Sequence, residues 1–326
     1  MPTHRERLEA CLSGGKLDRP PTALWRHFPV DDQLPETLAA ATLHWQQQYD
    51  WDLVKVTPAS SFCLKDWGVN DAWRGNSEGT REYVKRVVVE PKDWGKLPVI
   101  APNFPHLDAQ IKCLSLIRKN LPGDTPLIQT IFSPLAQAKN LAGGDALLLH
   151  LRENPEAVKK GLAVIAETTR RFITTALKTG IDGIFYAVQH AQADLLTEAE
   201  YVEFGRALDL HVLEATKPLW LNMLHLHGEN VYFDAVADYP VQVINWHDRD
   251  TAPSLVEGMD RFPGVVCGGL GIETMVYGNA ATVKSEATEA IEQTAGRRLI
   301  LGTGCVVPII TPHGNLMAAR KRVEKK

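Results

Sequence analysis

The sequence contains no apolar run long enough to cross a membrane, and residues 1–7 lack the apolar segment of a secretory signal. No tract of Lys and Arg stands out, and the formal net charge of the 326 residues is −4. The five cysteines are odd in number and widely spread, which argues against a disulfide framework. We therefore expect a cytoplasmic protein that binds neither nucleic acid nor a membrane.

No Gly-x-Gly-x-x-Gly motif follows the first expected strand, so nothing favours a doubly wound open sheet, the competing α/β architecture. The sequence does contain eight short apolar segments that alternate with helical ones. The expected strands are 22–28, 52–56, 126–132, 183–188, 218–227, 240–246, 264–267 and one that begins at 298. Most are continuously apolar, as in a parallel sheet buried on both faces. The count of eight predicts a (β/α)8 TIM barrel.

The hydrophobic content of 44% and the charged content of 23% are ordinary for a soluble enzyme. Helices are expected over 3–13, 35–49, 106–120, from 133 onward, 157–178, 197–216, 282–295 and 312–324. We expect one barrel domain over 1–326, with an irregular excursion at about 59–125 and a hairpin at 79–90 within it.

Three side chains that suit zinc follow two of the expected strands. In a (β/α)8 barrel the active site lies at the carboxyl ends of the strands. His225 and His227 are two residues apart at such an end, so both point to the same face. Cys305 follows the last strand. The set predicts a zinc site with three ligands and one open position. The alternative is that the histidines only form hydrogen bonds and Cys305 is a small buried filler.

Three other residues at expected strand ends are candidates for catalysis. Arg26 belongs to the first strand, where a guanidinium can bind a substrate carboxylate or pair with a neighbouring acid. Tyr186 lies near the end of 183–188. His247 follows 240–246, and its alternatives are a structural hydrogen bond or a bond that orients a metal ligand.

Three stretches resemble the uroporphyrinogen decarboxylase superfamily. They are Arg19-Pro20-Pro21 with Trp25-Arg26, Val243-Ile244-Asn245-Trp246, and Gly302-Thr303-Gly304-Cys305 followed by Pro308 and Thr311-Pro312. The last stretch is the most specific, and the resemblance extends over about residues 4–324. It implies a (β/α)8 barrel with its site at the carboxyl ends of the strands.

The uroporphyrinogen decarboxylases themselves use no cofactor. The resemblance implies a second arginine in the first loop, an aspartate at the end of the second strand and a histidine in the late glycine turn. Here Phe28 follows His27, Thr57 ends the second strand, and Thr303 occupies the turn. A cofactor-free decarboxylase of this type is therefore the alternative function, and a non-catalytic binding barrel is a third.

The other branch that the chain resembles comprises corrinoid- and coenzyme M-dependent methyltransferases. These bind zinc through a His-x-Cys pair and a late cysteine. His225 and Cys305 match that pattern, and His227 stands where the pattern has cysteine. The resemblance implies a zinc-dependent methyltransferase that moves a methyl group between a corrinoid or folate carrier and a small thiol or acid. A corrinoid protein is then an expected partner, and a homodimer is one alternative for the oligomeric state.

Overall fold

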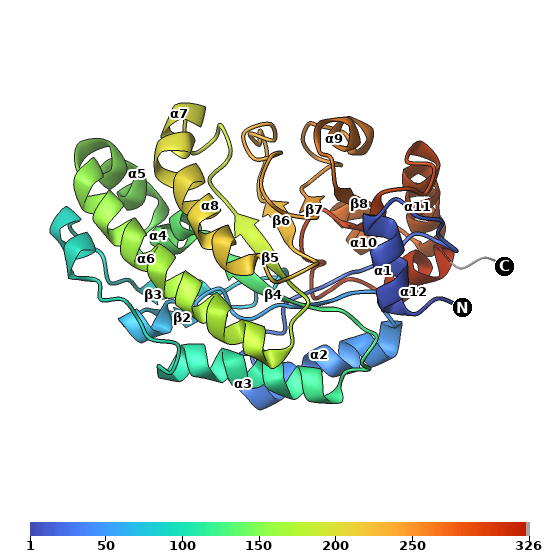
Figure 1. Ribbon diagram of the computed structural model, residues 1–326, viewed down its shortest axis with the longest axis horizontal. Helices are drawn as coiled ribbons and strands as arrows, with labels where there is room; N and C mark the ends of the chain where they lie inside the picture. The colour runs from blue at the N-terminus through green and yellow to red at the C-terminus, as the bar shows by residue number, and fades with distance from the viewer. Residues whose placement is uncertain (324–326) are drawn as a thin grey trace.

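A computed structural model describes residues 1–323, and its centre is a curled sheet of seven parallel strands (Figure 1). The strands are β1 (Val54–Val56), β4 (Leu127–Phe132), β5 (Gly183–Val188), β6 (Met223–Leu226), β7 (Val243–Asn245), β8 (Val265–Leu270) and β9 (Leu299–Thr303). They pair in the order of the chain, and nearly all of their residues are buried. The predicted α/β fold with a parallel sheet is confirmed.

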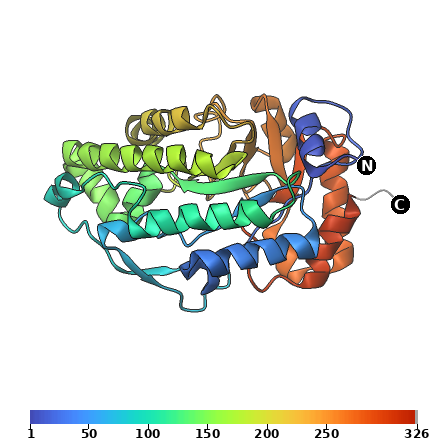
Figure 2. The ribbon, with the colours of Figure 1, turned by 60° about the horizontal axis from the view of Figure 1, so that its bottom comes forward.

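Helices surround the strands in Figure 1, and Figure 2 shows α2 and α3 side by side along one face. The helices are α1 (His4–Leu12), α2 (Pro35–Tyr49), α3 (Pro105–Asn120), α4 (Pro134–Ala142), α5 (Gly144–Glu153), α6 (Pro155–Ala176), α7 (Glu198–Tyr201), α8 (Ala207–Leu213), α9 (Leu255–Arg261), α10 (Ile272–Tyr277), α11 (Ala280–Gln293) and α12 (His313–Arg322). Within residues 1–323 no helix combines the length and the apolar character that a membrane span requires. The last residue of the predicted helix 312–324, Glu324, lies outside the described residues.

Among residues 1–323 the predicted closed barrel of eight strands is not formed. The segment expected as the first strand, 22–28, makes there a single isolated parallel bridge, from Thr22 to Leu301 of β9. The backbone N–H of Asp52, just before β1, donates to the carbonyl of Thr22 at 3.0 Å. The segment therefore lies between the two edges of the sheet. Pro21 lacks the N–H that a continuous ladder would need there.

The expected excursion holds a short antiparallel pair, β2 (Asn70–Ala72) and β3 (Glu82–Lys85). The predicted hairpin at 79–90 has the wrong boundaries, because β3 pairs with an earlier segment. The loop between β2 and β3 packs against the segment that contains His27 and Pro29. Gly79 has φ +85°, and a Cβ there would lie 2.5 Å from Cβ of His27, so the close approach requires glycine.

Candidate metal centre

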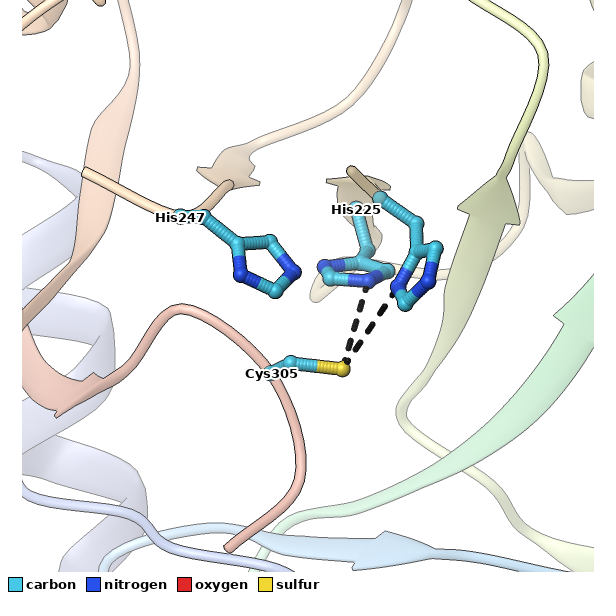
Figure 3. Close-up of side chains that lie close together, drawn as sticks. His225, His247 and Cys305 are labelled. Carbon is cyan, nitrogen blue, oxygen red and sulfur yellow. Dashed lines mark hydrogen bonds between the residues drawn. The ribbon is translucent and has the colours of Figure 1, made fainter. Parts of the chain in front are cut away.

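The three predicted metal ligands lie together at the carboxyl ends of β6 and β9. His225 belongs to β6, His227 follows it, and Cys305 follows β9. Sγ of Cys305 is 3.8 Å from Nε2 of His225 and 3.8 Å from Nδ1 of His227 (Figure 3). Gly304 permits this approach, because a Cβ there would lie 2.6 Å from Cα of His247.

His247, predicted as a catalytic residue, is a fourth member of the cluster. One ligand atom from each of His225, His227, His247 and Cys305 lies within 4.8 Å of the others. Nε2 of His247 is buried and has no hydrogen-bond partner among residues 1–323, while Nδ1 lies 3.5 Å from Asp250. We name these four residues the His–Cys cluster.

Asn245 fixes the tautomer of His225. Its Nδ2 donates to the carbonyls of Cys267 (2.8 Å) and Thr303 (3.0 Å), so the atom that faces His225 is Oδ1, which can only accept a hydrogen bond. Oδ1 lies 2.7 Å from Nδ1 of His225. Nδ1 therefore carries the proton, and the lone pair of Nε2 faces Cys305, as in a histidine prepared for metal binding.

Burial sets the charge of the cluster. It lowers the pKa of His225 well below its usual range, that of His227 to about 4, and that of His247 as well. The imidazoles are thus neutral at pH 7, with lone pairs available. Burial also raises the pKa of the Cys305 thiol to about 11. Neutral imidazoles and one thiol form a donor set that fits zinc, provided that the thiol loses its proton.

A cavity of about 520 Å³ opens beside the cluster. Its walls come from the carboxyl ends of the strands and from the loop before β3. Phe185 forms one wall and stacks on His225, with ring centroids 5.0 Å apart. Lys55 of β1 and Lys139 of α4 also line it, and neither was singled out from the sequence. A charged side chain inside an otherwise apolar strand, as Lys55 is in β1, is the signal that could have identified the first of them.

Arg26 does not line this cavity, in contrast to the prediction that it binds a substrate carboxylate. Its guanidinium lies over the rings of Trp45 (4.8 Å) and Phe28 (5.1 Å) and donates to the carbonyl of Ile309 at 3.3 Å. The neighbours of Arg26, Trp25 and His27, line the cavity instead. Alternate residues of an extended segment face opposite sides, which places Arg26 outside.

Tyr186 is also absent from the cavity lining, which corrects its prediction as a catalytic residue. It is fully buried on the other face of β5, where its hydroxyl donates to Asp209 of α8 at 2.7 Å. Asp209 also accepts hydrogen bonds from Tyr201 (2.8 Å) and Tyr239 (3.1 Å). Tyr186 therefore links α8 to β5 through a buried hydrogen bond.

We expect Tyr186→Phe to lower the free energy of unfolding by about 1–2 kcal/mol, because a buried carboxylate loses one hydrogen-bond donor. Zinc binding should not change. Chemical denaturation and a zinc titration measure the two effects. Tyr277→Phe, at a side chain that is 82% exposed, is the matched control. A loss of zinc binding in Tyr186→Phe, with unchanged stability, would restore a role at the site.

The fold and the site define an α/β protein with a histidine–cysteine cluster at the carboxyl edge of a parallel sheet. The profile of the family described as Uroporphyrinogen decarboxylase (URO-D) matches residues 3–326. The chain belongs to this family. No curated protein matches the chain.

Among solved structures, the chain is similar to a methyltransferase from Methanosarcina mazei, with 18% identity, 98% of each chain covered and a TM-score of 0.87. A B12-independent methionine synthase from Shewanella sp. W3-18-1 has 13% identity, covers 94% of this chain and 96% of its own, and gives a TM-score of 0.60. A putative vitamin-B12 independent methionine synthase from Listeria monocytogenes has 12% identity, 89% and 85% coverage and a TM-score of 0.58. At these identities the likeness establishes the fold alone.

Proposed function

We propose that this protein is a zinc-dependent methyltransferase that moves a methyl group between a corrinoid or folate carrier and a small thiol or acid. The observation that carries the proposal is the His–Cys cluster, whose donor atoms converge within 4.8 Å beside the cavity. The similarity in fold to the Methanosarcina mazei methyltransferase supports it. We further propose a corrinoid protein as the partner. We also propose that 22–28, the segment predicted as the first strand, takes the place of the eighth barrel strand between β9 and β1. The cytoplasmic location expected from the cysteines stays a prediction.

His225, His227 and Cys305 would hold the zinc, and His247, whose ligand atom lies within 4.8 Å of theirs, could contribute a fourth donor. When bound, zinc acts as a Lewis acid that lowers the pKa of a coordinated thiol. The protein's own residues prepare the site. Asn245 holds His225 in the tautomer that leaves Nε2 free, and Phe185 covers one face of that ring. In transfer from the carrier to a thiol, the thiol would lose its proton to solvent. Its sulfur would then form a bond to the methyl carbon while the bond between carrier and methyl breaks and its electron pair stays on the carrier.

The cofactor-free decarboxylase is the weaker proposal. Thr57 lines the cavity at the end of β1, where the resemblance implies an aspartate. A hydroxyl does not supply the negative charge that a protonated pyrrole intermediate requires. The nearby Lys55 adds positive charge to the same wall, which would destabilise such an intermediate further.

The test is methyl transfer from methylcobalamin to 3-mercaptopropionate. The loss of the methyl–cobalt absorption measures the rate, and mass spectrometry identifies the thioether product. We expect turnover by zinc-loaded protein and none after chelation, with recovery on adding zinc. In parallel, uroporphyrinogen should stay unchanged. Conversion of uroporphyrinogen to porphyrinogens with fewer carboxylates, without transfer of methyl groups, would favour the decarboxylase.

Zinc binding should release about one proton per ion near pH 8. The raised pKa of Cys305 keeps its thiol protonated in the metal-free protein, and the lowered pKa values leave the imidazoles without a proton to lose. The affinity should therefore fall as the pH falls. Calorimetry in buffers of different ionisation enthalpy counts the protons. Release that persists in Cys305→Ser would contradict this assignment.

A further inference from the structure

Two lysines in the cavity, Lys55 and Lys139, have no acidic partner within the described part of the chain. Lys55 is only 7% exposed, and its Nζ donates a hydrogen bond to Oγ1 of Thr57 at 3.3 Å. Lys139 is half-buried, and its Nζ donates to Oε1 of Gln189 at 3.0 Å. Among residues 1–323 neither ammonium forms an ion pair, so each keeps donors directed at neutral groups or at the cavity.

The other charged groups of the cavity do not balance these two. Arg81 is already paired with Asp71, at 2.8 Å, and Glu82 with Arg74, at 3.3 Å. Arg86 is cationic as well, and its Nη1 donates to the carbonyls of Lys139 and Asn140 at the end of α4. Glu78 remains as an exposed acid at the rim. The wall thus carries an excess of positive charge.

The unpaired positive charge on these side chains destabilises the folded protein. Burial lowers the pKa of Lys55 to about 7 and also lowers that of Lys139, which reflects the missing counter-charge. Nζ of Lys55 lies 4.4 Å from the ring centroid of Phe185, but a cation–π contact contributes only about 0.5–2 kcal/mol. An unpaired buried ammonium costs several kcal/mol, and Lys55 avoids part of that cost at pH 7 because it is then only partly protonated. A bound anion would remove that cost.

The positions of the lysines indicate where an anion would lie. Nζ of Lys55 lies 4.4 Å from the ring centroid of Phe185, and that ring stacks on His225. Lys139 donates to the side chain of Gln189, and the backbone carbonyls of Gln189 and His227 both accept hydrogen bonds from Gln192. Both lysines line the same cavity as His225, His227 and Cys305, so a ligand in that cavity has the two ammonium groups and the cluster among its walls. Planar carboxylates accept such charge-assisted hydrogen bonds well.

We propose that the cavity binds a small organic acid whose carboxylate is held by Lys55 and Lys139, which line the cavity together with His225, His227 and Cys305. This takes over the role predicted for Arg26. The proposal rests on the proposed function in one respect, that the substrate occupies this cavity. It does not require that zinc be bound.

The experiment is calorimetric titration with three compounds of similar shape, namely glutarate, its monoamide and its diamide, which carry two, one and no negative charges. Each is titrated into the full chain, both metal-free and zinc-loaded. We expect glutarate to bind at least about tenfold more tightly than the diamide. Lys55→Met and Lys139→Met should each reduce glutarate affinity about tenfold, whereas Lys85→Met, at an exposed lysine of β3, should not.

A second measurement separates binding from folding. Because the buried charge has no partner, Lys55→Met should leave the melting temperature unchanged or raise it, while acid binding falls. A lower melting temperature in Lys55→Met with unchanged glutarate binding would overturn the proposal. So would equal binding of glutarate and diamide, or no binding of any of the three. Protein that takes up no zinc but prefers glutarate would refute the methyltransferase and leave the acid site standing.

Discussion

Cys305→Ala is expected to bind zinc at least about a hundredfold more weakly than the unaltered protein. Structural zinc sites bind with about 10–16 kcal/mol, so removing one of four donors should cost about 3 kcal/mol or more. Sγ of Cys305 lies 3.8 Å from the facing nitrogens of both His225 and His227, so alanine leaves no donor on that side. Competition with a chromophoric chelator measures the change.

The melting temperature of Cys305→Ala should stay within a few degrees of the unaltered protein, because the side chain contributes to the site and only slightly to the core. Cys113→Ala is the control, since it removes an equally small thiol from the buried face of α3. It should keep full zinc affinity. Equal zinc affinity in the two variants would remove Cys305 from the metal site.

Asp52→Ala should lower the free energy of unfolding by about 3–5 kcal/mol, because it leaves buried cations without their partner. The Asp52 side chain is 0% exposed and accepts hydrogen bonds from Arg7 (2.7 Å), Arg19 (2.5 and 3.0 Å) and the backbone N–H of Thr22 (2.8 Å). His4 lies 2.9 Å away. One carboxylate thus ties α1 and the segment after it to the edge of β1.

The same contacts predict acid sensitivity. Burial alone would raise the pKa of Asp52, but the hydrogen bonds from His4 and Arg19 outweigh it, so the pKa is well below its usual range. The stabilisation is therefore present at neutral pH and is lost as the pH falls below about 4. Urea denaturation at pH 7 and at lower pH measures both effects. Asp234→Ala, in a surface ion pair, should change stability by no more than about 0.5 kcal/mol. Similar effects in both variants would contradict the role of Asp52.

The alternation of side chains along a strand explains both the successes and the errors at the site. From the sequence alone, this alternation predicted that His225 and His227 point to the same face of the strand. The same rule places Arg26 opposite its neighbours and Tyr186 opposite Phe185, yet both were assigned to the site because they lie near strand ends. The face of the strand to which a side chain points is thus a better criterion for assigning it to the site than its distance from the strand end.

Register between strands could not be read from the sequence, and this concealed the role of His247. In the structure His225 pairs with Asn245, so the next inward positions, His227 and His247, are neighbours. The pairing depends on how β6 and β7 align. His227 lies two residues beyond His225, and His247 lies two residues beyond Asn245. The aligned strands therefore add His247 to the three predicted ligands.

The elements of the fold were predictable where local signals were strong. Helix α2 has the predicted bounds, and all seven strands of the sheet fall at or near expected positions. Short helices were missed. α9 has only seven residues, although Ser254 and Glu257 form a capping box that could have marked its start. The prediction of a closed barrel was wrong at 22–28. Within residues 1–323 this segment follows Pro21, which lacks an N–H, and makes a single bridge instead of a continuous ladder.

X-ray absorption at the zinc edge of protein loaded with one equivalent of zinc tests the central claim most directly, because it counts the ligands and identifies their elements. We predict one zinc per chain, with one sulfur at about 2.3 Å and two or three imidazole nitrogens at about 2.0–2.1 Å. Cys305→Ser should remove the sulfur contribution. Protein that binds no zinc, or zinc coordinated only by oxygen atoms, would contradict the account.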